Sequence, residues 1–184
     1  ETFKLRAAYT GGASRSVVGT ATIVDDGTGT KYGPGPNDTS TSSLDDDRSL
    51  SVGDLTVNEA SNYAVFTVNG TAGLSVSLAL EGASGGSGIA DLRSGGTLPG
   101  LEVWNGTSWV AYDGTSTVMP ANGELHVRVS TVAEQDGTYE GGETFKLRAA
   151  YTGGASRSVV GTATIVDDGT GTKYGPGPND TSTS

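Results

Sequence analysis

The first 42 residues of the chain recur without a single change at its other end. Residues 1–42 read ETFKLRAAYTGGASRSVVGTATIVDDGTGTKYGPGPNDTSTS, and the same letters fill residues 143–184. The period is therefore 143 − 1 = 142 residues. It is longer than the roughly 20–50 residues of a solenoid turn, and it suits a whole domain with its linker. We therefore predict that the chain samples a tandem array of domains.

Composition divides this period into a folded part and a linker. Residues 27–47 are rich in Gly, Pro, Ser, Thr and Asp and show no regular alternation of apolar and polar residues, which is typical of a linker. We expect one autonomous unit over residues 48–168, with residues 169–184 opening the next linker. Residues 1–26 are then the C-terminal two-strand fragment of a preceding repeat.

Apolar and polar residues alternate along most of the unit, which predicts strands with one face on a core and one face in water. The alternation is clearest in residues 74–80, 124–129 and 144–151. The apolar phase of Val52 is reversed at Leu55, with Gly-Asp between them. This reversal predicts a β-bulge or a strand that changes from one sheet to the other.

Turn signals separate these strands. The segment LEVWNGTSWVAY at residues 101–112 predicts a hairpin that turns at Asn105-Gly106. Thirty glycines and only 34% hydrophobic residues fit short strands with many turns, and they do not fit helices. About seven to nine such strands make an immunoglobulin-like β-sandwich. The predicted fold class is therefore all-β, a tandem repeat of sandwiches joined by an extended linker.

The acidic charge of the chain excludes several kinds of partner and activity. The net charge of −10 lies entirely in residues 43–142, with 13 acidic and 3 basic residues. This charge disfavours nucleic acids and anionic membrane surfaces. The chain has no cysteine and a single histidine, His126, which alternation places on an outer face. These residues offer neither zinc ligands nor a nucleophilic triad, so we predict that the chain is not an enzyme.

Acidic residues gather at the ends of the predicted strands, where loops converge at one pole of a sandwich. A small domain without disulfides is often stabilised by bound metal ions that cross-link its loops, and calcium takes about six to eight oxygen ligands. The alternative is that these acids are simply solvated. The candidate ligands, chosen by position, are Asp25, Asp26, Asp45, Asp46, Asp47, Glu59, Asp136, Glu140, Glu143, Asp167 and Asp168.

Three motifs resemble the Calx-β repeat. They are VNEA at 57–60, YEGGETFKL at 139–147 and GTATIVDD at 161–168. The glycine-rich linker and the WNGTSWVAYDG hairpin resemble the version of this repeat found in very large bacterial adhesins of the RTX type, which leave the cell by type I secretion. The resemblance implies a sandwich that binds calcium near its poles and junctions. The ligands that it implies are Glu59, Asp136, Glu140, Glu143, Asp167 and Asp168.

The sequence thus predicts an extracellular, calcium-stabilised extender repeat of a bacterial surface adhesin, whose partners are neighbouring identical repeats. The alternative is a carbohydrate-binding module that stacks sugar rings on Trp104 and Trp109. Residues 1–26 and 143–168 are identical and compete for one place on the domain. We expect residues 143–168 to occupy it because they close the shorter loop. Residues 1–26 then remain available for strand exchange with a neighbouring molecule.

Overall fold

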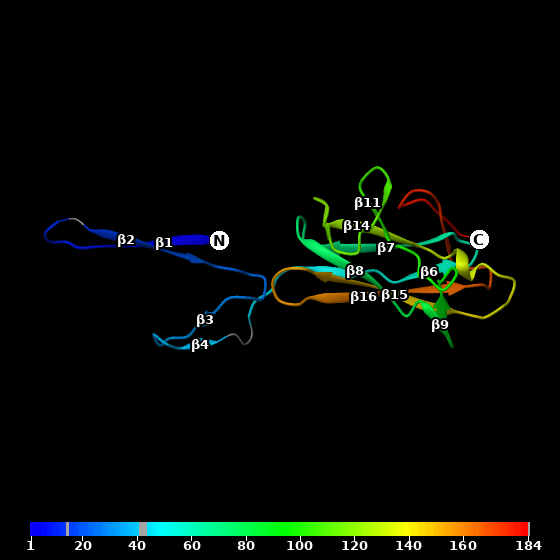
Figure 1. Ribbon diagram of the computed structural model, residues 1–184, viewed down its shortest axis with the longest axis horizontal. Helices are drawn as coiled ribbons and strands as arrows, with labels where there is room; N and C mark the ends of the chain where they lie inside the picture. Colours follow the sequence, from blue (N-terminus) through cyan, green and yellow to red (C-terminus); the bar gives the residue numbers. More distant parts are fainter. Residues whose placement is uncertain (14, 41–43, 184) are drawn as a thin grey trace. The chain divides into compact units, whose positions relative to one another are not determined.

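The computed structural model describes residues 1–13, 15–40 and 44–183. The chain forms two compact units, Glu1–Arg48 and Ser49–Ser184 (Figure 1). Within the described ranges, no helix has the length and hydropathy of a membrane span.

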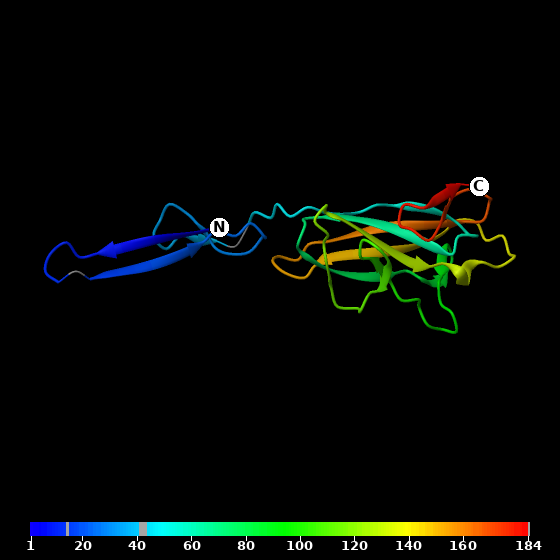
Figure 2. The same ribbon diagram turned by 90° about the horizontal axis from the view of Figure 1, so that it is seen from above.

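The larger unit is a sandwich of two sheets (Figures 1 and 2). The first sheet has the order β12-β11-β14-β7-β5. Its strands are β5 (Leu50–Val52), β7 (Tyr63–Gly70), β11 (Glu102–Trp104), β12 (Trp109–Ala111) and β14 (Glu124–Ser130). The second sheet has the order β13-β8-β15-β16-β6-β17-β18, and β10 pairs with both β15 and β9. Its strands are β6 (Leu55–Asn58), β8 (Ser75–Glu81), β9 (Ser84–Gly86), β10 (Ile89–Asp91), β13 (Thr117–Val118), β15 (Glu143–Tyr151), β16 (Ser158–Val166), β17 (Thr172–Tyr174) and β18 (Thr181–Thr183). The predicted immunoglobulin-like β-sandwich is confirmed.

The chain changes sheet between β5 and β6, which is one of the two outcomes that the reversed apolar phase predicts. β5 pairs antiparallel with β7 in one sheet, and β6 pairs parallel with β16 in the other. Gly161 of β16 lies against this crossing, where a Cβ atom would come within 2.5 Å of Val52 Cγ1 and 2.7 Å of the Gly53 carbonyl oxygen. A larger residue at 161 would force the crossing apart.

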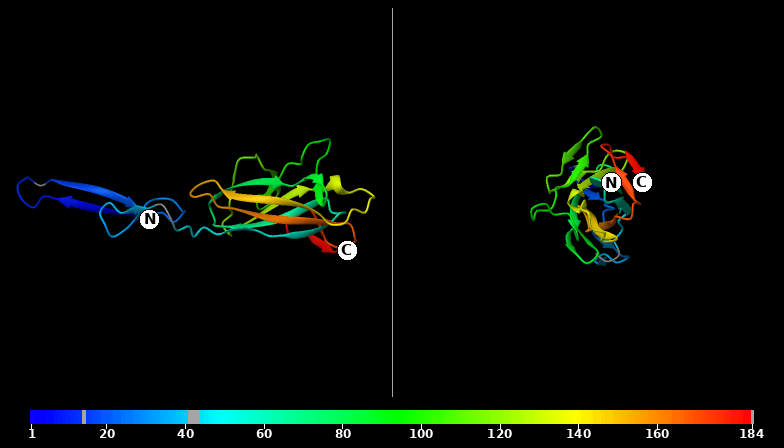
Figure 3. Two further views of the ribbon diagram at one scale, coloured as in Figure 1. Left: turned by 90° about the horizontal axis from the view of Figure 1, so that it is seen from below. Right: turned by 90° about the vertical axis from the view of Figure 1, so that its right-hand side faces the viewer.

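The core lies between the two sheets, which face each other in the larger unit (Figure 3). Alternate residues of β7, β14 and β15 are buried there. Phe66 and Phe145 meet edge to face, with ring centroids 5.8 Å apart.

The Tyr151 hydroxyl accepts a hydrogen bond from the Thr71 N–H at 2.7 Å and donates one to the Ser49 carbonyl. Residues 143–168 therefore occupy the place in the sandwich for which the two identical segments compete.

The predicted tryptophan hairpin is also confirmed. β11 and β12 pair antiparallel, with Trp104 opposite Trp109. The Asn105 Oδ1 accepts hydrogen bonds from the N–H groups of Thr107 at 3.0 Å and Ser108 at 2.9 Å. Gly106 has φ = 100°, a conformation that other residues rarely adopt. The local Asn-Gly signal therefore specified this turn correctly.

The sandwich extends beyond residue 168, the end expected from composition. Residues 172–183 form the hairpin β17–β18, and β17 joins the sheet beside β6. The Tyr174 N–H donates to Ser61 Oγ at 3.0 Å, and Trp109 Nε1 donates to the Pro176 carbonyl at 2.8 Å. The Gly-Pro-Gly-Pro run is therefore the turn of a docked hairpin in this unit, where the sequence predicts a linker.

His126 differs from its predicted exposure. It lies on the outer face of β14, as alternation requires, but it is only 9% exposed. Its Nε2 lies 2.9 Å from Glu124 Oε1, and its Nδ1 lies 3.4 Å from Thr67 Oγ1. Polar side chains of its own strand and of β7 therefore lie against His126. The contact with β7 cannot be read from alternation within one strand.

The smaller unit consists of two hairpins. β1 (Thr2–Ala8) pairs with β2 (Ser16–Thr22), and β3 (Lys31–Tyr32) pairs with β4 (Thr39–Ser40). An isolated bridge joins Asp26 to Asp46, and the Arg48 Nη2 donates to the Asp26 carbonyl at 2.9 Å. The region predicted as a linker is therefore partly folded here as well.

Candidate metal centre

Four segments of the larger unit bring carboxylates to one end of the sandwich. Glu59 directly follows β6, and Asp167 directly follows β16. Glu134 ends the short 3-10 helix η1 (Val132–Glu134), and Glu143 begins β15. The loop from 135 to 142 joins the last two elements and adds Asp136 and Glu140. Figure 1 shows η1 and this loop, in yellow, beside the end of β16.

The carboxylates surround a small hollow. One carboxylate oxygen each of Glu134, Glu140 and Glu143 lies within 4.8 Å of the others. The hollow has a volume of about 10 Å³, close to the space that one water molecule needs. Its lining residues are Glu59, Glu134, Thr138, Glu140, Gly141, Glu143, Ile165 and Asp167. The site is therefore of a size for a single ion or water molecule and not for an organic substrate.

Backbone hydrogen bonds fold the loop around these side chains. The Asp136 N–H donates to Glu59 Oε1 at 3.1 Å, and the Glu140 N–H donates to Asp167 Oδ2 at 2.7 Å. The Thr138 N–H donates to Asp136 Oδ1 at 2.6 Å. These bonds fix carboxylates that are far apart in the sequence, and each still leaves oxygen lone pairs for another ligand.

One oxygen of the site has no partner. Asp167 Oδ1 is buried and makes no hydrogen bond. A buried carboxylate oxygen without a partner is costly, since it has lost its water and gained nothing in return. A cation in the hollow would supply the missing interaction. The orphaned oxygen and the three neighbouring glutamate carboxylates are oxygen donors of the kind that a calcium ion takes.

The acids of the site raise one another's pKa values. Burial, followed by a hydrogen bond to Glu143 and the charge of Glu143, raises the pKa of Glu134 to about 7. The pKa of Glu140 is also raised, chiefly by the charge of Glu143, with further contributions from burial and from Asp136, Asp167 and Glu59. The ionised cluster is therefore electrostatically strained. Its ligand atoms are all oxygens, the type that Ca²⁺ and Mg²⁺ prefer over softer metals.

This strain predicts how the metal-free chain responds to pH. The folded-state pKa of Glu134, about 7, exceeds its ordinary value of 4.5, so the folded state binds more protons between these values. Stability should then fall as pH rises from about 5 to about 7. Urea unfolding in EDTA at several pH values measures this slope. Glu134→Gln should make the slope shallower, and an unchanged slope would contradict the assignment to Glu134.

The structure brings five of the predicted ligands together. They are Glu59, Asp136, Glu140, Glu143 and Asp167. Asp168 differs, because its Oδ1 accepts hydrogen bonds from the Thr170 N–H at 2.9 Å and hydroxyl at 2.6 Å. These bonds lower the pKa of Asp168, the hydroxyl bond most strongly. Asp168 does not line the hollow.

The other predicted ligands lie in the smaller unit. Asp26 accepts hydrogen bonds from Thr28, which lower its pKa. Asp46 forms an ion pair with Arg48, with Oδ1 2.8 Å from Nε. The Asp45 carbonyl accepts a hydrogen bond from the Gly27 N–H. Metal binding by these residues and by Asp25 and Asp47 stays a prediction.

Sequence reasoning missed Glu134. The residue is 8% exposed and is one of the three whose carboxylates lie closest together. It precedes Asp136 by two residues in the same acidic segment, and this proximity is the signal by which it could have been found. It lies in η1, where the strand alternation has already ended.

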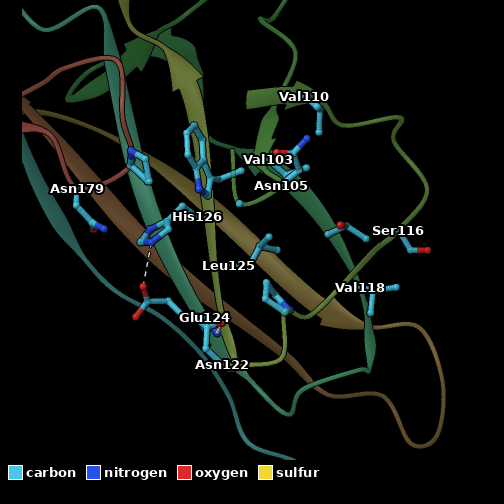
Figure 4. Close-up of a pocket in the computed structure, with 15 residues that line it drawn as sticks. Val103, Asn105, Val110, Ser116, Val118, Asn122, Glu124, Leu125, His126 and Asn179 are labelled. Atoms are coloured by element: carbon cyan, nitrogen blue, oxygen red, sulfur yellow. Dashed lines mark hydrogen bonds and ion pairs between the residues drawn. The ribbon is translucent and has the colours of Figure 1, made fainter. Parts of the chain in front are cut away.

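The two tryptophans of the alternative sugar site contact each other. Their ring centroids lie 5.4 Å apart at 66°, and the Arg128 guanidinium lies 4.6 Å from the Trp109 ring. A groove next to this hairpin is lined by Trp104 itself and by both apolar and polar side chains, among them Val110, Asn105 and Asn179 (Figure 4). Sugar binding by Trp104 and Trp109 stays a prediction, and their rings already have partners within the protein.

Comparisons with known proteins give distant likenesses among solved structures. No protein-family model and no curated protein sequence matches the chain. Among solved structures, it is similar to the periplasmic chaperone SfaE (10% identity, TM-score 0.37), to AggA, the major subunit of aggregative adherence fimbriae type I from Escherichia coli (19%, 0.40), and to the E. coli chaperone DraB (14%, 0.35). Each match covers 66% of this chain, and 58%, 96% and 56% of those chains respectively. The chain thus spans little more than half the length of the two chaperones.

Proposed function

We propose that the chain is a calcium-stabilised structural repeat of a bacterial surface adhesin, and that tandem copies hold a distal ligand-binding region away from the cell. The observation that carries the proposal is the carboxylate hollow around the unpartnered oxygen of Asp167. The letter-for-letter repeat supports a role in length, since identical units in series add distance without adding new recognition surfaces.

The cluster ties together segments that the chain separates widely. Glu59, Glu134 and Asp167 follow three different elements of the sandwich. A calcium ion held by these carboxylates would supply the positive charge that offsets their repulsion. Without it, the ionised side chains repel one another, as the raised pKa values of Glu134 and Glu140 indicate. Metal binding then becomes folding free energy for the whole repeat.

The same chemistry supports a location outside the cell and a role without catalysis. Extracellular calcium modules bind with dissociation constants of about 0.1–1 mM, so the ion would be bound outside and absent in the cytosol. We propose type I secretion as the route, with the calcium-free repeat less stable before export. The hollow is too small for a substrate, which favours a structural role over an enzymatic one.

Thermal unfolding of the 184-residue chain tests the proposal. The chain is melted in EDTA, in calcium and in magnesium at the same ionic strength. At 100 times the dissociation constant, one calcium site adds about 2.7 kcal/mol, or about 5–15 °C in Tm for a domain of this size. Magnesium should have a smaller effect because it requires tighter octahedral geometry. Identical melting temperatures in EDTA and calcium would exclude the proposed role.

A further inference from the structure

The hairpin β1–β2 of the smaller unit exposes an apolar face. Phe3 is 56% exposed, Leu5 72% and Tyr9 77%. Ile23, which directly follows β2, is 58% exposed. Phe3, Leu5 and Tyr9 are separated by even numbers of residues, and the strand register places Ile23 in the same phase, so they lie on one face of the hairpin. Large apolar residues grouped in this way usually mark a surface that another chain covers.

The chain itself shows what covers such a face. Phe145, Leu147 and Tyr151 are the identical counterparts of Phe3, Leu5 and Tyr9, and they are 1%, 0% and 7% exposed. β15 pairs with β8, and β16 pairs with β6. The partners of this face are therefore residues 49–142, which form the rest of the sandwich. We call the place between β8 and β6 the hairpin slot.

The free hairpin already has the shape that the slot accepts. β1 and β2 pair from Thr2↔Thr22 to Ala8↔Ser16. β15 and β16 have the same register, 142 positions later, with Thr144↔Thr164 and Ala150↔Ser158 within their ladder. No change of strand register is needed for docking, which lowers the entropic cost of association.

The free hairpin also carries counterparts of two acids of the carboxylate cluster. Glu1 is the counterpart of Glu143, and Asp25 is the counterpart of Asp167. A hairpin seated in the slot would therefore bring both acids to the carboxylate cluster of its host. This gives the predicted ligand Asp25 a place in a metal centre.

From these observations we propose that the apolar face of β1–β2 docks in the hairpin slot of a second copy of residues 49–142 and completes that copy's sandwich by strand exchange. The interaction does not depend on the proposed calcium role, because the buried face is apolar. It makes residues 1–26 the closing element of another domain.

Two variants of the full chain test this proposal. Leu147→Asp places a charge at a fully buried position and disables the chain's own hairpin. Leu5→Asp changes the identical residue of the free hairpin, where the side chain is 72% exposed, and leaves the larger unit intact. The recipient is the double variant, which has an empty slot and no intact hairpin. The donors are the wild-type chain and the Leu5→Asp chain.

Each donor is refolded together with the recipient from urea in calcium-containing buffer. Light scattering then measures molar mass, and tryptophan fluorescence reports the recipient's sandwich. We expect a 1:1 complex of twice the 18.5 kDa chain mass with the wild-type donor, and loss of that complex with the Leu5→Asp donor. Equal behaviour of the two donors, including precipitation of the recipient with both, would overturn the proposal. Because the donors differ only at residue 5, a failure of calcium binding cannot produce this difference.

Discussion

An Asp167→Asn chain is expected to melt at the same temperature with and without calcium. The substitution removes the charge of Asp167 and replaces the unpartnered oxygen or its neighbour with an amide nitrogen, which cannot bind a cation. The loss equals the stabilisation that the ion supplies, about 2.7 kcal/mol at 100 times the dissociation constant. In EDTA the variant should be at least as stable as the wild type, because the charge of Asp167 helps to raise the pKa of Glu140.

The neighbouring residue provides a matched control. Asp168→Asn changes the same functional group one position later, but Asp168 bonds to Thr170 and does not line the hollow. The Asp168→Asn chain should therefore keep the calcium-induced rise in Tm. Paired melts of both variants in EDTA and in calcium make the comparison. If calcium raises the Tm of the Asp167→Asn chain but not that of the Asp168→Asn chain, Asp168 and not Asp167 is the calcium ligand.

Phe66→Ala is expected to destabilise the larger unit by about 3–5 kcal/mol. Phe66 is completely buried, and its ring meets Phe145 edge to face. Truncation removes this contact and leaves a cavity between the two sheets, which rigid strands fill only in part. Phe66 lies outside the duplicated segment, so the free hairpin cannot replace it. Equilibrium unfolding by urea in EDTA measures the effect without a contribution from calcium.

Phe3→Ala is the control for this prediction. Phe3 is 56% exposed in the smaller unit, and its removal should change the free energy of unfolding of the sandwich by less than about 0.5 kcal/mol. If the two variants lose similar stability, the core does not lie between the sheets as the structure places it.

Patterns within single strands predicted much of this fold. The phase reversal between Val52 and Leu55 correctly marked the change of sheet, because side-chain direction alternates with a period of two residues. The Asn105-Gly106 turn was predictable for a similarly local reason, since few residues adopt a positive φ. Both signals are contained in a few consecutive residues.

Features that depend on distant contacts were not predictable in the same way. The hairpin β17–β18 is held by Trp109 and Ser61, which lie 67 and 113 positions from their partners Pro176 and Tyr174. A segment rich in Gly and Pro gives no local sign of such docking.

The carboxylate cluster shows the same division between local and distant information. Strand ends indicated that loops converge at a pole, and Glu59, Glu140, Glu143 and Asp167 line one hollow there. The sequence did not separate Asp167 from Asp168, since the choice depends on the Asx-type turn that Asp168 forms with Thr170. It also missed Glu134, whose burial depends on how η1 packs.

A crystal structure of the chain grown in calcium would show whether the carboxylate hollow binds an ion. Anomalous scattering locates the ion, and refinement gives its ligands. We expect one ion in the hollow, bonded to Asp167 Oδ1 and to carboxylate oxygens of Glu134, Glu140 and Glu143 at about 2.3–2.6 Å. A hollow without an ion at saturating calcium, with Asp167 Oδ1 bound to water or to a protonated glutamate, would contradict it.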